Sequence, residues 1–285
     1  MKQINAFRYL TVIFAAITLI LSGCKKDEDP TVQNDNSNSA VYKDMAAEAG
    51  RADFVENDVD LLADEAARGH FGPNGPQGPQ GILNPCATVT HDTVSVPHII
   101  TIDFGPVNCL GNDGHWRRGQ IIVTYTGPYW AAGSVRTIGF NGYHVDDNSI
   151  TGTRTVTNNG QNSSGNYNWT IDVVNFTITK PNGNWFSRNS NRNREMIQGY
   201  GTINPWDDVY LITGTANGQK SNGHTLNTTI TNALRKEVGC KWIVSGTMDM
   251  APNNLPVKTV DFGNGTCDNI ATVTVNGISH TIILP

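Results

Sequence analysis

Seven Asn-Gly pairs after Cys86, set between short runs rich in Thr, Val and Ile, constrain the fold of this chain more than any other feature. Asn and Gly tolerate the positive φ angles that two-residue hairpin turns require, and β-branched residues favour strands. The closing segment shows this most clearly, because the runs 272–275 and 278–284 flank Asn276-Gly277. The sequence therefore predicts an antiparallel β domain over residues 86–285. The seven pairs begin at Asn141, Asn159, Asn182, Asn217, Asn222, Asn264 and Asn276.

The expected fold class is all-β, an antiparallel meander of about a dozen strands, because no long helical period appears after residue 86. A sheet of that size is uncomfortable when open, so we expect a sandwich or a closed barrel. The related segments Ile-Thr-Gly-Thr at 150–153 and 212–215 and Val-Ser-Gly-Thr at 244–247 indicate equivalent strands. Their glycines are expected where strands bend or bulge.

An internal repeat carries four cysteines. Ile-Asp-Phe-Gly at 102–105 is echoed by Val-Asp-Phe-Gly at 260–263, and a cysteine follows each glycine by four positions. Each copy also has an upstream cysteine, and a hairpin folded between the two would bring them together. Of the three possible connectivities we favour Cys86 with Cys109 and Cys240 with Cys267, in an oxidising compartment. The absence of a CxxC spacing argues against a metal site built from these cysteines.

The N-terminal residues resemble a bacterial lipoprotein signal. A basic start and a short apolar run precede Leu-Ser-Gly-Cys, which resembles the sequence read by lipoprotein-processing enzymes. The apolar run is shorter than a membrane-spanning helix requires. The resemblance implies that residues 1–23 are removed and that Cys24 carries lipid, so that the membrane is the first expected partner.

Three segments are expected to connect the anchor to the β domain. Residues 24–39 are rich in Asn, Asp and Ser and predict a flexible tether. Residues 40–69 predict a short acidic amphipathic helix, with Ser39 as its cap, whose apolar stripe packs on the domain rather than on a partner. Residues 70–85 contain Gly-Pro triplets and predict an extended spacer.

Charge is concentrated before the β domain. Residues 27–66 contain twelve acidic residues against Lys43 and Arg51, whereas 86–285 are balanced. Because nucleic-acid binding needs a basic face, we expect no nucleic-acid partner.

The duplicated Asp-Phe-Gly-x-x-x-Cys hairpins, Asn-Pro-Trp-Asp-Asp at 204–208 and the closing hairpin resemble a family of uncharacterised Gram-negative bacterial lipoproteins. The likeness runs from Cys86 to the end and implies location and fold without a mechanism. The stretch Lys25 to Asp29 resembles an export signal of surface lipoproteins. Together they imply an outer-membrane, surface-exposed protein, with the periplasmic face as the alternative.

Known catalytic motifs are absent from the sequence: it has no HExxH, GxSxG, phosphate-binding glycine loop or calcium-binding loop. No metal site or cofactor is expected. Asp146, Asp147, Asp207 and Asp208 are the carboxylates considered for a hydrolase, but surface and turn roles are commoner for aspartates of this kind.

Tryptophans in Gly- and Pro-rich surroundings are the best binding signals. Trp185 and Trp206 are named as candidates for stacking on a sugar, as are Trp116 and Trp130 more weakly, although core packing is the commoner role. Arg188, Arg192 and Arg194 would share one face of a strand. They are candidates for holding an acidic polysaccharide, but a charged face that discourages edge pairing is the favoured interpretation.

Asp92-Thr93-Val94 resembles a bacterial O-glycosylation acceptor, which makes Thr93 a candidate modification site. The sequence as a whole favours a non-enzymatic, lipid-anchored envelope or surface domain with a structural or binding role, its partner a polysaccharide or an envelope protein. The alternatives are an envelope hydrolase acting on glycan or peptide, and a small-ligand carrier if the sheet closes into a barrel.

Overall fold

The computed structural model describes residues 30–68, 81–83, 85–202, 205–253, 255–275 and 277–284. Within these residues one long helix, α1 (Pro30–Arg68), is followed by fourteen strands and a short 3-10 helix, η2 (Pro205–Asp207). The strands are β1 (Thr88–Asp92), β2 (His98–Asp103), β3 (Cys109–Leu110), β4 (Trp116–Tyr125), β5 (Val135–Val145), β6 (Asn148–Gln161), β7 (Tyr167–Thr179), β8 (Trp185–Gln198), β9 (Val209–Lys220), β10 (Thr225–Glu237), β11 (Ile243–Pro252), β12 (Lys258–Asn264), β13 (Ile270–Val275) and β14 (Ile278–Ile283).

The strands form one antiparallel meander, so the predicted fold class is confirmed. Each strand pairs with the next along the chain, except that β3 makes a short side pair with β4 and the path runs from β2 directly to β4. Among the described strands, β1 and β14 are the two edges of an open sheet. The closed alternative is therefore not adopted.

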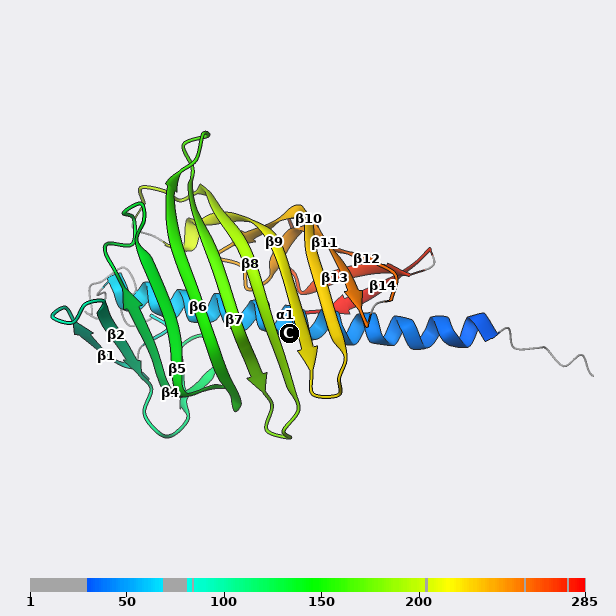
Figure 1. Ribbon diagram of the computed structural model, residues 1–285, viewed down its shortest axis with the longest axis horizontal. Helices are drawn as coiled ribbons and strands as arrows, with labels where there is room; N and C mark the ends of the chain where they lie inside the picture. Colours follow the sequence, from blue (N-terminus) through cyan, green and yellow to red (C-terminus); the bar gives the residue numbers. More distant parts are fainter. Residues whose placement is uncertain are drawn as a thin grey trace, which may run out of the picture.

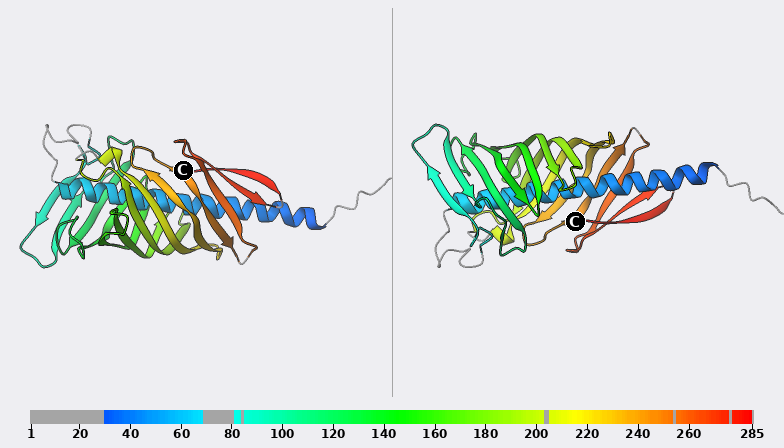
Figure 2. Two further views of the ribbon diagram at one scale, coloured as in Figure 1. Left: turned by 90° about the horizontal axis from the view of Figure 1, so that it is seen from above. Right: turned by 90° about the horizontal axis from the view of Figure 1, so that it is seen from below.

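Helix α1 lies along the inside of the curled sheet. Figure 1 shows α1 crossing the strands along the long axis of the molecule, with its N-terminal end extending past the sheet, and both views of Figure 2 show the strands curling around it. The helix begins at Pro30, so residues 30–39, predicted as a flexible tether, are helical and Ser39 is not its cap. Proline suits the first turn, and no Gly or Pro follows before Gly50 to interrupt the polar stretch.

The apolar stripe of α1 is buried, as predicted. Its backbone approaches β2, β11, β13 and β14 most closely, because the stripe contains many alanines. Glu65 accepts hydrogen bonds from the backbone N–H groups of Ile82 and Leu83, which holds the chain against the helix near its C-terminal end. The buried apolar residues of the helix are Tyr42, Met45, Ala46, Ala49, Ala52, Val55, Val59, Leu62, Ala63 and Ala66.

The acidic side of α1 is buried too, against arginines of the sheet. Long arginine side chains span the wider gap between the helix and β4 to β8, where each meets a carboxylate. Five arginines and four carboxylates form one connected network of ion pairs, which leaves one positive charge in excess. Its members are Asp53, Glu56, Asp60 and Asp64 of α1 and Arg136, Arg154, Arg188, Arg192 and Arg194 of the sheet.

Glycines of the repeated Gly-Thr segments sit at β-bulges, as predicted. Gly152, Gly214 and Gly246 have φ angles of +106°, +125° and +108°. Each lies at a shift in strand register. A Cβ on Gly214 would lie 2.3 Å from the carbonyl oxygen of Asn191, so the backbones of β8 and β9 approach too closely for a side chain.

Only some of the Asn-Gly pairs are hairpin turns. Asn182-Gly183 and Asn222-Gly223 lie in the β7–β8 and β9–β10 turns, and β13 and β14 pair as predicted, although Asn276 is outside the described residues. Gly142 and Gly160 instead have positive φ within β5 and β6. Gly218 lies within β9, where a Cβ would meet the ring of Phe186. Glycine in these strands permits bulging or close packing rather than reversal of the chain.

Both predicted disulfides are confirmed. Cys86 pairs with Cys109, which joins the segment before β1 to β3. Cys240 pairs with Cys267, which joins the β10–β11 connection to the β12–β13 connection.

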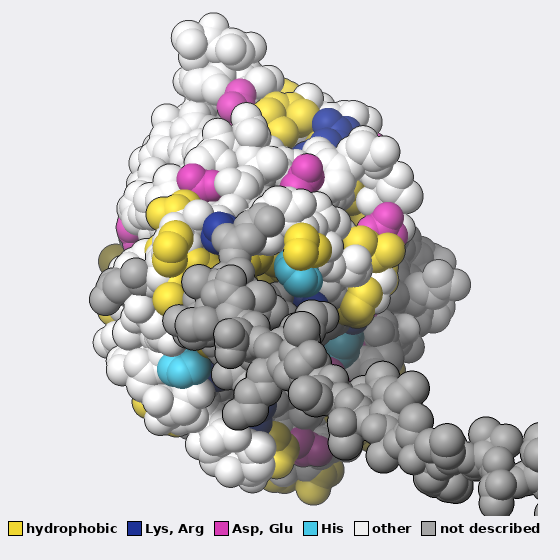
Figure 3. All heavy atoms as spheres, turned by 90° about the vertical axis from the view of Figure 1, so that its right-hand side faces the viewer, with side chains coloured by type: hydrophobic (Ala, Val, Ile, Leu, Met, Phe, Trp, Pro, Cys, Tyr) yellow, Lys and Arg dark blue, Asp and Glu magenta, His cyan; other side chains and the backbone are white. Residues whose placement is uncertain are grey.

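Figure 3 shows the side from which α1 emerges. Its described residues present mainly white atoms, which are backbone and uncharged polar side chains, with scattered hydrophobic and charged side chains among them. Within the described part of the chain, no helix is both long enough and apolar enough to cross a membrane. The signal peptide 1–23, Cys24 and the Gly-Pro triplets of 72–80 lie outside the described residues.

Candidate functional site

Aromatic side chains gather near the C-terminal end of α1. The β4–β5 connection carries Tyr129 and Trp130 over Trp169, which points inward from β7. The Tyr129 ring stacks on the Trp169 ring with centroids 5.5 Å apart, and Trp130 meets Trp169 edge to face at 5.6 Å. Such offset and edge-on contacts are favourable because they bring positive ring edges to negative ring faces.

The aromatic cluster continues to the surface. Tyr167 and Tyr200 lie 4.6 Å apart between ring centroids, and Trp130 contacts both rings edge to face. Trp130 is 38% exposed and Tyr200 is 57% exposed, whereas Trp169 is fully buried. The cluster therefore presents an exposed rim supported by a rigid buried ring.

A cavity of about 290 Å³ opens beside this cluster. Its volume is near the lower end of the range for small-ligand sites, which are mostly apolar with a few polar groups. Besides the aromatic rings it has Asp64, Arg136 and Asn158 in its wall. We call it the aromatic cavity, and its aromatic lining consists of Tyr125, Tyr129, Trp130, Trp169 and His91.

The charged Arg136 in the wall of the aromatic cavity pairs with a carboxylate of α1. Arg136 donates a hydrogen bond from Nη1 to Asp64 and lies over the Tyr129 ring, 5.1 Å from its centroid. Although burial opposes its charge, Asp64 and Asp60 raise the pKa of Arg136. Burial and the neighbouring Asp64 also raise the pKa of Tyr129 to about 12, so its hydroxyl is neutral at physiological pH.

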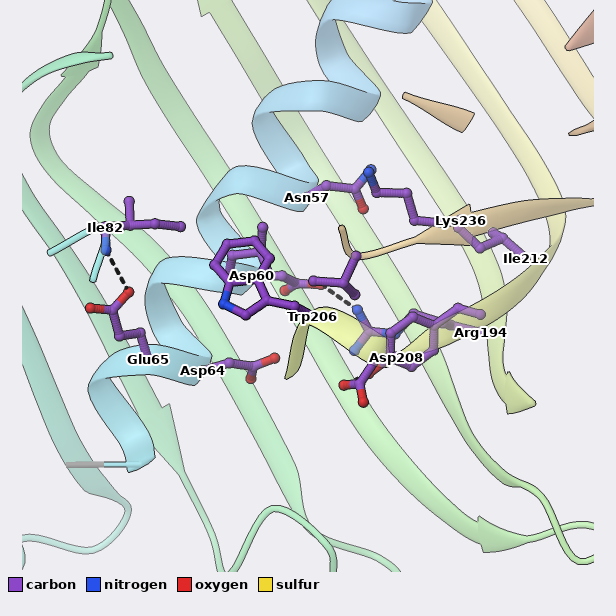
Figure 4. A pocket seen from close by; sticks show the side chains of 13 residues that line it. Asn57, Asp60, Asp64, Glu65, Ile82, Arg194, Trp206, Asp208, Ile212 and Lys236 are labelled. Atoms are coloured by element: carbon purple, nitrogen blue, oxygen red, sulfur yellow. Dashed lines mark hydrogen bonds and ion pairs between the residues drawn. The ribbon is translucent and has the colours of Figure 1, made fainter. Parts of the chain in front are cut away.

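A second, polar cavity lies on the other side of Asp64. Figure 4 shows Asp60 and Asp64 reaching toward it from α1, with Trp206 and Asp208 opposite, while Glu65 turns toward Ile82. Its volume is about 50 Å³, room for a few water molecules but not for a sugar ring. Lys236 lines it from β10, and burial lowers the pKa of this amine to about 8.

The carboxylates of the polar cavity are committed to structural contacts. Asp60 pairs with Arg154 and Arg194, and Glu65 accepts two backbone N–H groups. Asp208 accepts a hydrogen bond from the Tyr210 hydroxyl at 3.0 Å. General acid catalysis needs a carboxyl group that is free to give up a proton to substrate, and these contacts work against that role.

The aspartates at 146 and 147 occupy the β5–β6 turn, both with positive φ. Asp146 binds His115 and the backbone of Trp116, and Asp147 binds Arg118 and Asn108. They fix a turn. Asp207 lies in η2, where it accepts a hydrogen bond from Thr202.

The three arginines singled out in the sequence share one face of β8, but that face looks inward. Arg188 and Arg192 bind Asp53, and Arg194 binds Asp60. β8 lies between β7 and β9, so protection of a sheet edge is not their role, and that prediction is wrong. Their carboxylate partners come from α1, so the sequence of β8 alone could not predict these ion pairs.

The two predicted tryptophans lie apart. Trp206, 44% exposed, borders the polar cavity, whereas Trp185 begins β8 beside the β7–β8 turn and lines neither cavity. Of the weaker candidates, Trp130 lines the aromatic cavity. Sequence reasoning missed Tyr129, Trp169 and Tyr200. The only available signal was the Pro-Tyr-Trp stretch of the loop, since Trp169 and Tyr200 are distant along the chain.

Thr93 lies in the exposed β1–β2 connection. The neighbouring Asp92 accepts hydrogen bonds from the backbone of Val94 and Ser95, which turns the chain there. The side chain of Thr93 is accessible to a modifying enzyme, and it stays a candidate.

No protein-family model, curated protein or solved structure matches this chain. Within the described ranges, no group of three or more His, Cys, Asp or Glu side chains is arranged to hold a metal ion.

Proposed function

We propose that this protein is a lipid-anchored envelope domain that binds carbohydrate in the aromatic cavity. The observation that carries the proposal is the exposed Trp130 and its aromatic neighbours beside a cavity of about 290 Å³. Flat rings cover the apolar faces of a sugar, while Asp64, Arg136 and Asn158 place polar groups in the cavity wall.

The position of the cavity along α1 supports display at a membrane. The helix begins six residues after Cys24, the proposed lipid site, whereas Asp64 and Ala67 line the cavity near the other end. The intervening 34 residues of helix span about 50 Å at about 1.5 Å per residue. The proposed anchor and the proposed ligand site therefore lie toward opposite ends of one rigid element, as suits a surface-exposed protein of the outer membrane. The periplasmic face is the alternative.

The other two functions have weaker support. A carrier was expected only if the sheet closed, but the described sheet is open and α1 fills its concave side. A hydrolase needs carboxylates beside a substrate-sized cavity, and those of the polar cavity are bound to protein groups in a space of about 50 Å³.

Glycan-array binding by the chain 25–285, with both disulfides intact, tests the proposal. This chain keeps every described residue. We expect selective binding that falls roughly tenfold in Trp130→Ala, which is about 1.4 kcal/mol. Trp185→Ala is the matched control, since Trp185 is remote from the cavity, and it should bind like the wild type. Equal loss in both variants, or no binding by the folded wild type, would refute the proposed site.

Metabolic labelling with a radioactive fatty acid tests the anchor. The full-length chain expressed in a Gram-negative host should incorporate label and fractionate with the outer membrane. Cys24→Ala should do neither, because it removes the thiol to which the diacylglyceryl group is attached. Label retained in Cys24→Ala would contradict lipidation at this position.

A further inference from the structure

Arg136 has an unused hydrogen-bonding edge. Its Nη1 binds Asp64, but neither Nε nor Nη2 has a hydrogen-bond partner, and the side chain is only 6% exposed. Nη2 lies 3.6 Å from an oxygen of Asp60, close enough for attraction but too far for a hydrogen bond. Nε and Nη2 together form the edge of a guanidinium that grips both oxygens of a carboxylate.

A second orphan donor lies in the same cavity wall. The indole N–H of Trp169 has no partner, although the ring is fully buried. A buried N–H group without an acceptor costs stability, so two such groups beside one cavity indicate that acceptor oxygens arrive with a ligand. Four other arginines also have an Nε without a hydrogen-bond partner, but none of them lines the aromatic cavity: Arg51, Arg117, Arg192 and Arg194.

We infer that the aromatic cavity takes an acidic sugar, a pyranose bearing a carboxylate that binds the Nε and Nη2 edge of Arg136. This inference rests on the proposed carbohydrate-binding function and narrows its ligand to uronic acids and related acidic sugars. The edge is buried in the free protein, so side chains of the cavity wall have to shift when the ligand enters.

Matched sugars separate this inference from the function on which it rests. The probes are oligosaccharides of glucose and galactose, their glucuronate and galacturonate counterparts, and the methyl esters of those acids. An acid and its ester differ in charge but hardly in shape. Calorimetric titration of the chain 25–285 should show the free acid binding roughly tenfold or more tightly than its ester.

Two variants assign the preference to the guanidinium edge. Arg136→Lys keeps the positive charge beside Asp64 but cannot grip two oxygens from one edge, so the acid-to-ester ratio should fall to about two or less. Trp130→Ala should weaken acid and ester by the same factor. Circular dichroism and thermal unfolding establish that each variant is folded, and Arg136→Gln provides a second test if Arg136→Lys is not.

The outcomes are distinct. If the wild type binds acid and ester equally, or if a folded Arg136 variant keeps the full ratio, the acidic-sugar inference is wrong while carbohydrate binding stands. If the folded wild type binds none of these sugars, carbohydrate binding is refuted and the narrower inference falls with it.

Discussion

Asp60 is the residue on which the buried charge network converges. It pairs with Arg154 and Arg194, and Arg136 approaches within 3.6 Å. Burial alone would raise the pKa of Asp60, but these guanidinium groups hold it well below the usual range. Its ionised form therefore stabilises the fold above the ordinary carboxyl pKa of about 4, and this contribution is lost as the pH falls toward the folded value.

Replacing this carboxylate tests the importance of the network. Asp60→Asn leaves two buried guanidinium groups short of a partner, which should lower the free energy of unfolding at pH 7 by about 3 to 5 kcal/mol. Asp44→Asn is the matched control, because Asp44 pairs with Lys220 at 2.6 Å but is half exposed. Asp44→Asn should lower the free energy of unfolding by about 1 kcal/mol or less. Urea unfolding of both variants makes the comparison, and equal losses would mean that burial adds nothing.

Lys236 gives the opposite pH dependence. Burial lowers the pKa of its amine from 10.5 to about 8, so above pH 8 the unfolded chain holds a proton that the folded chain does not. Below pH 8 the buried ammonium lowers the free energy of unfolding by the full amount, on the order of 3 kcal/mol. This destabilisation decreases as the pH rises from about 8 to 10.5. The Lys236 ammonium donates a hydrogen bond to the Cys240 carbonyl, which offsets part of this destabilisation.

Lys236→Met removes the charge while keeping most of the side-chain volume. We expect the variant to unfold with a higher free energy than the wild type at pH 7, and the difference to shrink toward pH 10.5. Urea unfolding at unit steps between pH 7 and pH 10 measures it. All other titratable groups are the same in both proteins, so the difference between the two is the relevant quantity. A difference independent of pH would contradict burial of a charged amine.

Local patterns predicted individual residues well when one segment contained the whole signal. The disulfides followed from cysteines placed on either side of turn-like midpoints. The shared face of Arg188, Arg192 and Arg194 followed from the alternation of side chains along a strand. What that face meets could not be predicted, because Asp53 and Asp60 are more than 130 positions away.

Elements were predicted by type more reliably than by length. The helix was expected to start at residue 40 because Asn, Asp and Ser are typical of linkers, yet α1 begins ten residues earlier. Packing of its apolar stripe and ion pairs from Asp44 onward stabilise the helix inside the sheet, and its first turns continue outward from this packed part. The bulges, by contrast, were predicted correctly, since glycine is the residue that the local backbone requires.

The bulge glycines provide a test at the scale of a strand. Gly214→Ala would place a Cβ 2.3 Å from the Asn191 carbonyl oxygen at a φ of +125°, so β8 and β9 would have to separate. Gly183→Ala, in the β7–β8 turn, has a φ of +83° and no atom within 4 Å of its Cβ, so it reports backbone strain alone. We expect Gly183→Ala to lower the free energy of unfolding by about 1 to 2 kcal/mol, and Gly214→Ala to lower it by at least about 2 kcal/mol more.

Thermal and urea unfolding of the two glycine variants make this comparison. A Gly214→Ala protein no less stable than Gly183→Ala would show that the paired strands give way without loss, and that the close approach is not needed for the fold.

The whole molecule was predictable as a class but not as an arrangement. An antiparallel meander followed from the strand and turn pattern, whereas the position of α1 inside the sheet depends on the complementarity of two segments that are each unremarkable in sequence. The aromatic cavity is the clearest example. Its lining combines the β4–β5 connection with Trp169 of β7 and the C-terminal part of α1, and no local pattern connects them.

The position of α1 inside the sheet also determines how the molecule carries mechanical load. A pull on the N-terminal end of the helix acts along its axis, across strands that lie side by side from β4 to β9 (Figure 1). The ion pairs and packed side chains along the helix then share the force in parallel, as bonds loaded in shear do, instead of opening one after another as a peeled strand would. Tension between a ligand bound, as proposed, at the aromatic cavity and the proposed lipid anchor would therefore load these contacts together in shear.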